Sequence, residues 1–326
     1  MTALGHVSRA AFVAAFATLA ISGRAAPALR AQQVPAPGQE RGPQTNAAAI
    51  GLRVLPVQGS VYLIAGAGGN ITMQIGEDGV LLVDSGLADR NPQVLDAIRR
   101  VTDRPVRQIV NTHVHEDHTG GNDAFTKVGV PILAHENMLN RMSAPTGAPP
   151  PRPVGAWPSD TFFTPEKEIF FNGEGIEILH VPAAHTDGDV LVYFRRSDVI
   201  ATGDVFITTH FPIIDTERGG TMNGLVNALN RVLDITIPRR NQEGGTYVIP
   251  GKGRLADEAD VVEFRDMSTI IRDRMRAMID NGMTWAQVRA ATPALDYEGR
   301  WGATTGLGTT DAFLEAVFND LSRSRR

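Results

Sequence analysis

Four residues that can bind a metal ion stand within six positions of one another in this 326-residue chain: His113, His115, Asp117 and His118. They directly follow an apolar run, 106–110, that is typical of a buried strand. In an extended segment His113 and His115 project to the same side, because side chains alternate along a strand. Asp117 and His118 stand where the chain turns towards the next helix, and they can reach the same cavity from another direction. Zinc prefers imidazole and carboxylate ligands, so the spacing predicts a catalytic metal site that activates water.

The composition leaves histidine and carboxylate as the available ligands for such a metal. The sequence has eight histidines and no cysteine, which excludes disulfides, cysteine-based zinc sites, iron–sulfur clusters and thiol nucleophiles. Its 42% apolar and 21% charged residues fit an ordinary globular protein. A net charge of −5 argues against a nucleic-acid partner, which would need a basic face. The expected partner is therefore a small-molecule substrate.

The segments that must position these residues alternate between strands and helices. Two short β-like runs, 61–64 and 71–75, precede strands at 80–83, 106–110 and 131–134, which are separated by predicted helices at 91–101 and 120–128. Further strands are expected at 168–171, 176–181, 190–194, 198–202 and 247–249, and helices at 221–234, 257–281, 284–291 and 310–323. Residues 143–168 hold seven prolines and are expected to form a long loop. The order of elements indicates an α/β (α+β) protein, and two β-rich halves, each followed by helices, would allow a four-layer αββα sandwich.

The ends of the chain differ from this central part. Residues 1–31 combine Arg9, an apolar Ala-rich run and a cluster of small residues, which is the layout of a secretory signal peptide. Residues 32–55 are rich in Gln, Pro, Ala and Gly and are expected to be a flexible linker. The domain is expected at 56–255, with a helical C-terminal extension, 256–326, packed on it. This layout predicts a periplasmic or secreted protein without a stable membrane anchor after signal cleavage.

The motif His113-x-His115-x-Asp117-His118 resembles the signature of the metallo-β-lactamase-fold superfamily. Three further positions match that family in order: Asp84 at the end of a buried strand, His185 in Ala184-His185-Thr186-Asp187-Gly188-Asp189, and Asp204 in Thr202-Gly203-Asp204. The resemblance implies the αββα sandwich, with one or two zinc ions at its open edge and Asp84 supporting the metal loop from behind. It implies a first metal site of His113, His115 and His185, and a second of Asp117, His118 and Asp204. Asp117 is our candidate for the general base.

The last ligand of that family is normally a histidine in a Pro-Gly-His-Gly segment, whereas this chain has Pro250-Gly251-Lys252-Gly253. A protonated lysine repels a metal ion, so the second site is expected to be weakened. Three interpretations stay open. Lys252 supplies its charge in place of the second metal, pairs with Asp117 or Asp204 and grips an anionic substrate. His210 replaces the missing ligand, or Lys252 points to solvent beside a damaged site.

The function expected from these residues is an exported zinc-dependent hydrolase that attacks an ester, thioester or amide/lactam carbonyl. One alternative keeps the fold but holds a single iron through His113, His185 and Asp204 and oxidises sulfur compounds. Another alternative is a non-catalytic binding module on a degenerate metal site, because Lys252 stands where a ligand is expected. Metal analysis of the purified protein separates these hypotheses.

Two further features are expected beside the site. The segment Gly66-x-Gly68-Gly69-Asn70 is predicted to form a hairpin or flap there, because it lies between two strands and not before a helix. His135 is expected to make local hydrogen bonds near the rim, and His180 is expected to be a buried side chain within a strand.

Overall fold

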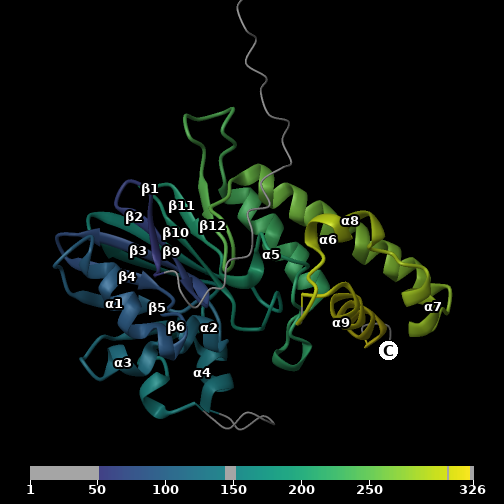
Figure 1. The fold of residues 1–326 in the computed structure, drawn as a ribbon, viewed down its shortest axis with the longest axis horizontal. Coiled ribbons are helices and arrows are strands. Elements are labelled where there is room, and N and C mark those ends of the chain that lie inside the picture. The colour runs from purple at the N-terminus through teal and green to yellow at the C-terminus, as the bar shows by residue number, and fades with distance from the viewer. Residues whose placement is uncertain (1–50, 144–151, 307, 324–326) are drawn as a thin grey trace, which may run out of the picture. The chain divides into compact units, whose positions relative to one another are not determined.

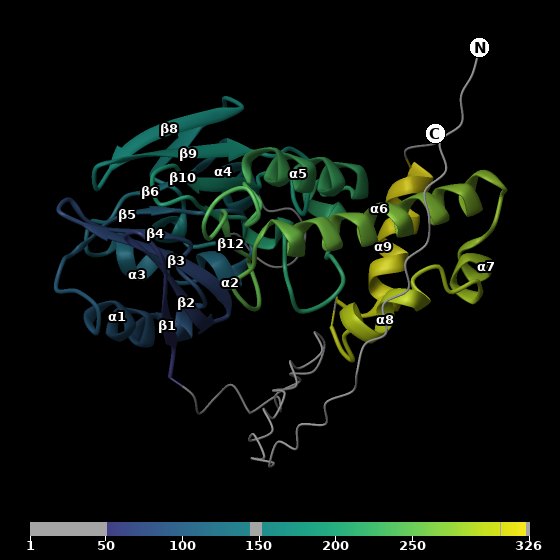
Figure 2. The ribbon, with the colours of Figure 1, turned by 90° about the horizontal axis from the view of Figure 1, so that it is seen from above.

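Two β-sheets lie face to face, and helices cover their outer faces (Figure 1, Figure 2). This computed structural model describes residues 51–143, 152–306 and 308–323, all of them within one unit of the chain, Asn46–Arg326. The expected signal peptide, 1–31, and the expected linker up to residue 50 lie outside the described residues.

The first sheet follows chain order in its seven described strands: β1 (Arg53–Gln58), β2 (Val61–Ala67), β3 (Gly69–Gly76), β4 (Gly79–Val83), β5 (Val106–Val110), β6 (Ile132–His135) and β7 (Asp160–Phe162). Strands β1 to β4 pair antiparallel, and β4 to β7 pair parallel. Because β4 and β5 run parallel, Asp84 and the histidine motif follow them at the same edge of the sheet.

The second sheet contains, in spatial order, β12 (Tyr247–Ile249), β11 (Val199–Ala201), β10 (Val190–Phe194), β9 (Glu174–His180) and β8 (Glu166–Phe171). Its strands pair antiparallel, except for the parallel pair of β11 and β12. Asp204 and Lys252 therefore leave this sheet at a shared edge, each three residues beyond the end of its strand.

Alternating apolar side chains build the layers of the sandwich. In β4, Leu81 belongs to the core between the sheets, whereas Leu82 packs with Val94 of helix α1 (Asn91–Arg99) on the outer face. In β10, Val192 belongs to the core between the sheets, and Leu191 belongs to the outer core formed with the long helices. Strands buried on both faces need such apolar runs. The expected four-layer αββα sandwich is confirmed over the described residues.

The described helices near the first sheet are short, and three of those near the second sheet are longer. The first set, besides α1, contains α2 (Glu116–Thr119), α3 (Asn122–Thr126) and α4 (Glu136–Ser143). The second set contains α5 (Met222–Ile235), α6 (Glu258–Asp280), α7 (Trp285–Ala290), α8 (Leu295–Trp301) and α9 (Thr310–Arg323). A capping box of Asp257 and Asp260 starts α6. Helices α5 to α9 share one apolar core with the second sheet. None of the described helices combines the length and the apolar character needed to cross a membrane.

The structure differs from the expected elements at several places. The linker prediction is wrong over 53–55, because these residues pair with β2 as part of β1. The helix expected at 120–128 is interrupted, and α2 and α3 meet at Gly120 and Gly121. A Cβ at Gly121 would lie 2.5 Å from the Ser85 carbonyl oxygen, so this close approach of two segments requires glycine. Strand β7 and the start of β8 lie inside the expected loop, and α4 and α8 were not expected from the sequence.

Candidate metal centre

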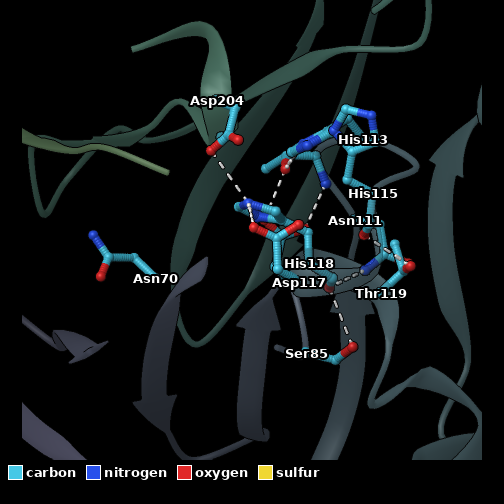
Figure 3. Close-up of polar contacts among 12 residues, drawn as sticks. Asn70, Ser85, Asn111, His113, His115, Asp117, His118, Thr119 and Asp204 are labelled. Carbon is cyan, nitrogen blue, oxygen red and sulfur yellow. Dashed lines mark hydrogen bonds and ion pairs between the residues drawn. The ribbon is translucent and has the colours of Figure 1, made fainter. Parts of the chain in front are cut away.

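The residues predicted as metal ligands gather at the edge where these strands end. Two groups of potential ligand atoms form there, and within each group the atoms lie within 4.8 Å of one another. The first group contains His113, His115, His185 and Asp204, and the second contains Asp117, His118 and Asp204. Figure 3 shows Asp204 reaching the histidine motif from a separate segment of the chain. Because Asp204 belongs to both groups, it is placed to bridge them.

Hydrogen bonds on the outer side of the site determine which nitrogens of His115 and His185 can bind a metal ion. His115 Nε2 lies 2.8 Å from Asp215 Oδ2, and His185 Nδ1 lies 2.7 Å from the Ile213 carbonyl oxygen. A carboxylate or carbonyl oxygen only accepts, so these two nitrogens carry hydrogens. The opposite nitrogens, His115 Nδ1 and His185 Nε2, then face each other at 2.8 Å with their lone pairs. A cation bound to both would offset this repulsion, so the pair fits a metal ion.

Asp84 organises the other two histidines from behind the site. Asp84 Oδ2 accepts a hydrogen bond from the Thr112 hydroxyl at 2.7 Å and lies 2.7 Å from His118 Nδ1. Since the Thr112 hydroxyl donates to Asp84, its oxygen accepts from His113 Nδ1 at 3.0 Å. Among the described residues, the buried Nε2 of His113 has no hydrogen-bond partner, whereas the buried Nε2 of His118 lies 3.2 Å from Asp204 Oδ1. Buried polar atoms are normally satisfied, and outer partners of this kind orient metal-binding imidazoles, so His113 Nε2 fits a metal ligand. Asp84 likewise turns His118 Nε2 towards Asp204, the carboxylate of the second group.

The histidines of the two ligand groups differ in their pKa values. Burial and the neighbouring imidazoles hold the pKa of His113 well below its usual range, and burial and His115 also lower the pKa of His185. Burial alone would lower the pKa of His118, but Asp204 and Asp84 outweigh it and raise that pKa to about 10. His113 and His185 therefore offer neutral imidazoles to a metal ion, whereas a metal ion bound to His118 in the second group would have to displace a proton.

Lys252 reaches into the second group. Its Nζ lies 2.7 Å from Asp117 Oδ2 and also contacts Asp204 Oδ2, and only 23% of its side chain is exposed. Burial alone would lower the pKa of Lys252, but Asp204 and Asp117 outweigh it and raise the pKa. His210 is in neither ligand group of the described residues, and its Nδ1 lies 2.7 Å from the Phe211 carbonyl oxygen. Of the three interpretations, the geometry therefore matches the one in which the lysine pairs with the two carboxylates.

The glycine-rich hairpin predicted beside the site contacts both the lysine loop and a ligand. Asn70 Nδ2 donates to the carbonyl oxygens of Pro250 at 2.9 Å and Gly253 at 3.1 Å, on either side of the lysine. A Cβ at Gly69 would lie 2.5 Å from His118 Cε1, so no larger residue fits there. The hairpin therefore holds the loop that carries the ammonium group.

Sequence reasoning missed two residues that position the ligands. Thr112 directly precedes the histidine motif, but its role depends on Asp84, which is 28 positions away. Asp215 holds His115 across 100 positions and belongs to no motif of its own. Arg218 in turn pairs with Asp215 at 2.7 Å. No local pattern in the sequence signals such pairings.

The superfamily model of metallo-beta-lactamases matches residues 54–244. The chain belongs to the metallo-beta-lactamase superfamily. A linear primary-alkylsulfatase of a Pseudomonas species is 25% identical over 254 residues, which cover 64% of this chain and 46% of the relative. Two solved structures share the superfamily fold. A sec-alkylsulfatase from Pseudomonas has a TM-score of 0.61 at 17% identity, with 82% of this chain and 50% of that chain covered. A metallo-beta-lactamase from Pontibacter korlensis has a TM-score of 0.55 at 19% identity, with 67% of this chain and 99% of that chain covered.

The matches cover only part of the alkylsulfatases and only part of this chain. The chain spans about half the length of both alkylsulfatases. The superfamily match ends at residue 244, before Lys252 and before helices α6 to α9. The family match therefore does not describe Lys252 or the C-terminal helices of this chain.

A second pair of histidines lies outside the ligand groups of this superfamily member. The ring of His135, only 4% exposed, stacks on that of His180 with centroids 3.6 Å apart. His180 Nε2 lies 2.8 Å from the Asp187 carbonyl oxygen, and the carboxylate of Asp187 pairs with Arg141. Burial and His180 lower the pKa of His135 to about 4, against the opposing effect of Asp187.

We expect this pKa to make the protein sensitive to acid. The unfolded chain binds a proton at His135 near pH 6.5 and the folded chain only near pH 4, so stability is lost as the pH falls between these values. At pH 5 the loss from this group is about 2 kcal/mol relative to neutral pH. The free energy of unfolding, measured with denaturant at pH 7 and pH 5, should fall less in His135→Phe than in the wild type. Phenylalanine keeps a ring at this position but cannot titrate. An equal loss of stability in both proteins would contradict this expectation. Release of a metal ion in acid would affect both proteins equally, so the difference between them reports on His135.

Proposed function

We propose that this superfamily member is a metal-dependent hydrolase that holds one catalytic metal ion, zinc, in the first ligand group. In place of a second metal, the ammonium of Lys252 lies between Asp117 and Asp204. The observation that carries this proposal is the position of Lys252 Nζ, 2.7 Å from Asp117 and in contact with Asp204. Both carboxylates of the second group thereby contact a positive charge that comes from a side chain of the protein itself.

The donor set supports zinc in the first group. Three imidazoles with inward-facing nitrogens suit a catalytic zinc site, which takes three protein ligands and keeps a fourth position for water. Asp204, the carboxylate of the same group, is paired with Lys252. When bound there, the metal supplies Lewis acidity towards water and towards an ester-type bond. The names of the relatives, a sulfate ester hydrolase and a lactamase, support hydrolysis of an ester, thioester or amide/lactam bond in a small molecule.

Asp117 and Lys252 have distinct proposed roles beside that metal. Burial alone would raise the pKa of Asp117, but His118 and Lys252 outweigh it and lower that pKa, so the side chain is a carboxylate at neutral pH. With 26% of its side chain exposed, Asp117 is open to receive a proton from a water molecule that attacks the substrate. Lys252 holds that carboxylate in place and offers positive charge to an oxygen that becomes negative during the reaction.

The substitution Lys252→His tests whether the lysine takes the place of a second metal. We expect wild-type protein dialysed against zinc to bind one equivalent per chain and the variant to bind two, because imidazole is a ligand and ammonium is not. Lys127→His is the matched control, because Lys127 is 72% exposed and pairs only with Asp123 among its described contacts. Metal content by plasma emission spectrometry gives the measurement.

The metal analysis separates the proposed hydrolase from its two alternatives. One equivalent in both Lys252→His and the wild type contradicts the substitution of a metal by lysine. Iron without zinc in protein purified without added metal contradicts the hydrolase and favours the sulfur-oxidising alternative. Absence of any metal, together with no hydrolysis of esters or lactams in added zinc, favours a binding module.

We also propose that the protein is exported to the periplasm or secreted. The layout of residues 1–31 supports this proposal. N-terminal sequencing of the protein recovered outside the cytoplasm should give a mature chain that starts near residue 29 or 32. A chain that keeps Met1 in the cytoplasm would contradict export.

A further inference from the structure

An open pocket of about 440 Å³ lies directly beside the first ligand group. His115 is both a member of that group and part of the pocket wall. The rest of the wall comes from the loop after β11 and from α9, the last described helix. A volume of this size is typical of small-molecule pockets, which lie in the range of about 300–1,000 Å³.

Apolar groups dominate the wall away from the metal centre. Ile213 and Ile214 contribute from the loop, and Phe313 contributes from α9. Ala312 and Ala316 stand one helical turn apart on α9, and both line the pocket. Their small side chains leave the space open. A larger residue at either position would fill it.

Polar residues also line the pocket, and three of them connect its wall to the metal centre. His115 Nε2 lies 2.8 Å from Asp215, and Asp215 lies 2.7 Å from the guanidinium of Arg218. All three residues line the pocket. The charge of Asp215 is thus shared between two partners, and the polar side of the wall continues from the ligand group.

The apolar wall is joined firmly to the loop that positions the ligands. The rings of Phe211 and Phe313 stack with centroids 5.1 Å apart and an angle of 5° between the planes. The backbone N–H of Phe211 donates to the Trp301 carbonyl oxygen of α8 at 2.7 Å. The C-terminal helices therefore form a fixed side of the pocket.

We propose that this pocket binds the apolar part of the substrate, an alkyl chain or ring of several carbons, while the bond to be cleaved lies at the metal centre. The position of the cleaved bond at the metal centre rests on the proposed hydrolase function, whereas binding of an apolar group in the pocket does not. It makes α9 a determinant of specificity, with Ala312 and Ala316 setting the space available. Continuity of the pocket with His115 and the apolar character of its far wall support this occupant.

Binding of straight-chain carboxylates tests the pocket without requiring catalysis. Acetate, butyrate, hexanoate and octanoate are titrated into zinc-loaded full-length protein by calorimetry. We expect affinity to rise by up to about fourfold for each methylene buried, until the pocket is full. In Ala316→Phe, octanoate should lose at least about tenfold in affinity while acetate is unchanged, because only the longer chain needs the filled space. Ala312→Leu provides a second, smaller change in case the first variant folds poorly.

The matched control is Asn319→Phe, which adds the same side chain to an exposed position of α9 outside the pocket wall. It should bind octanoate as the wild type does. The pocket assignment is overturned if carboxylate affinity does not depend on chain length. It is also overturned if Asn319→Phe loses as much affinity for octanoate as Ala316→Phe does. If chain-length dependence and its loss in Ala316→Phe are seen but no ester is hydrolysed, the proposed hydrolase fails and the pocket stands.

Discussion

Replacing His115 with alanine should weaken zinc binding by more than about 100-fold and reduce hydrolysis at least as much. Removal of an outer hydrogen-bond partner alone typically costs 10–100-fold in metal affinity, so removal of a ligand should cost more. His115 suits this test because 24% of its side chain is exposed and its partner Asp215 keeps Arg218 at 2.7 Å. The variant should therefore stay folded. Equilibrium dialysis with zinc and initial rates on an ester panel give the two measurements.

His210→Ala is the control for this loss of a histidine. His210 lies in neither ligand group of the described residues, so the variant should keep both its zinc and its activity. Loss of one zinc equivalent in His210→Ala would instead identify it as a ligand. Unchanged zinc affinity in His115→Ala would contradict the first ligand group.

Replacing Asp84 with alanine should lower the free energy of unfolding by about 3–5 kcal/mol, because it leaves a buried charge and a buried donor without partners. Asp84 is 2% exposed and accepts hydrogen bonds from the backbone N–H and the hydroxyl of Thr112, each at 2.7 Å. It also lies 2.7 Å from His118 Nδ1. Its φ of 67° is left-handed, a conformation that aspartate tolerates better than alanine. A loss of this size is a large part of the stability of a typical domain.

The cost is measured by denaturant unfolding of the apo protein, so that metal binding does not contribute. Asp84→Asn keeps an oxygen for Thr112 but turns an amide towards His118, and it should fall between the wild type and Asp84→Ala. Asp89→Ala is the matched control, because the Asp89 side chain is 75% exposed and should cost less than about 0.5 kcal/mol. A similar small loss in Asp84→Ala would show that the contacts of Asp84 carry no net stability.

Several elements could be predicted from local apolar patterns, whereas the αββα sandwich was implied mainly by the resemblance of the site motifs to the superfamily. The run at 80–83 and the helix that begins at Asn91 both lie where the sequence predicts them. Boundaries that depend on contacts between segments could not be predicted. Gly121 stands between α2 and α3, where it packs against the Ser85 backbone, and residues 53–55 join a strand because β2 lies beside them.

Four candidate ligands could be named from the sequence because their motif is contiguous and the chain has no cysteine, and His185 and Asp204 could be named from the resemblance to the superfamily. Their organisation could not be predicted. Which nitrogen of His115 is free depends on Asp215, and which nitrogen of His113 is free depends on Thr112 and Asp84. These partners are distant in the chain, and one-dimensional patterns carry no information on them.

The sequence by itself determined the donor types at the site, histidine and carboxylate, and the replacement of an expected histidine by Lys252. Only the tertiary structure decided what that lysine contacts, because Asp117 and Asp204 come from different sheets and meet Lys252 only where both sheets end. It also brought α9 next to His115, which no spacing in the sequence indicates. The physical reason is the same in both cases. Residue chemistry is local, whereas the distance between charges and the shape of a pocket depend on how the layers pack.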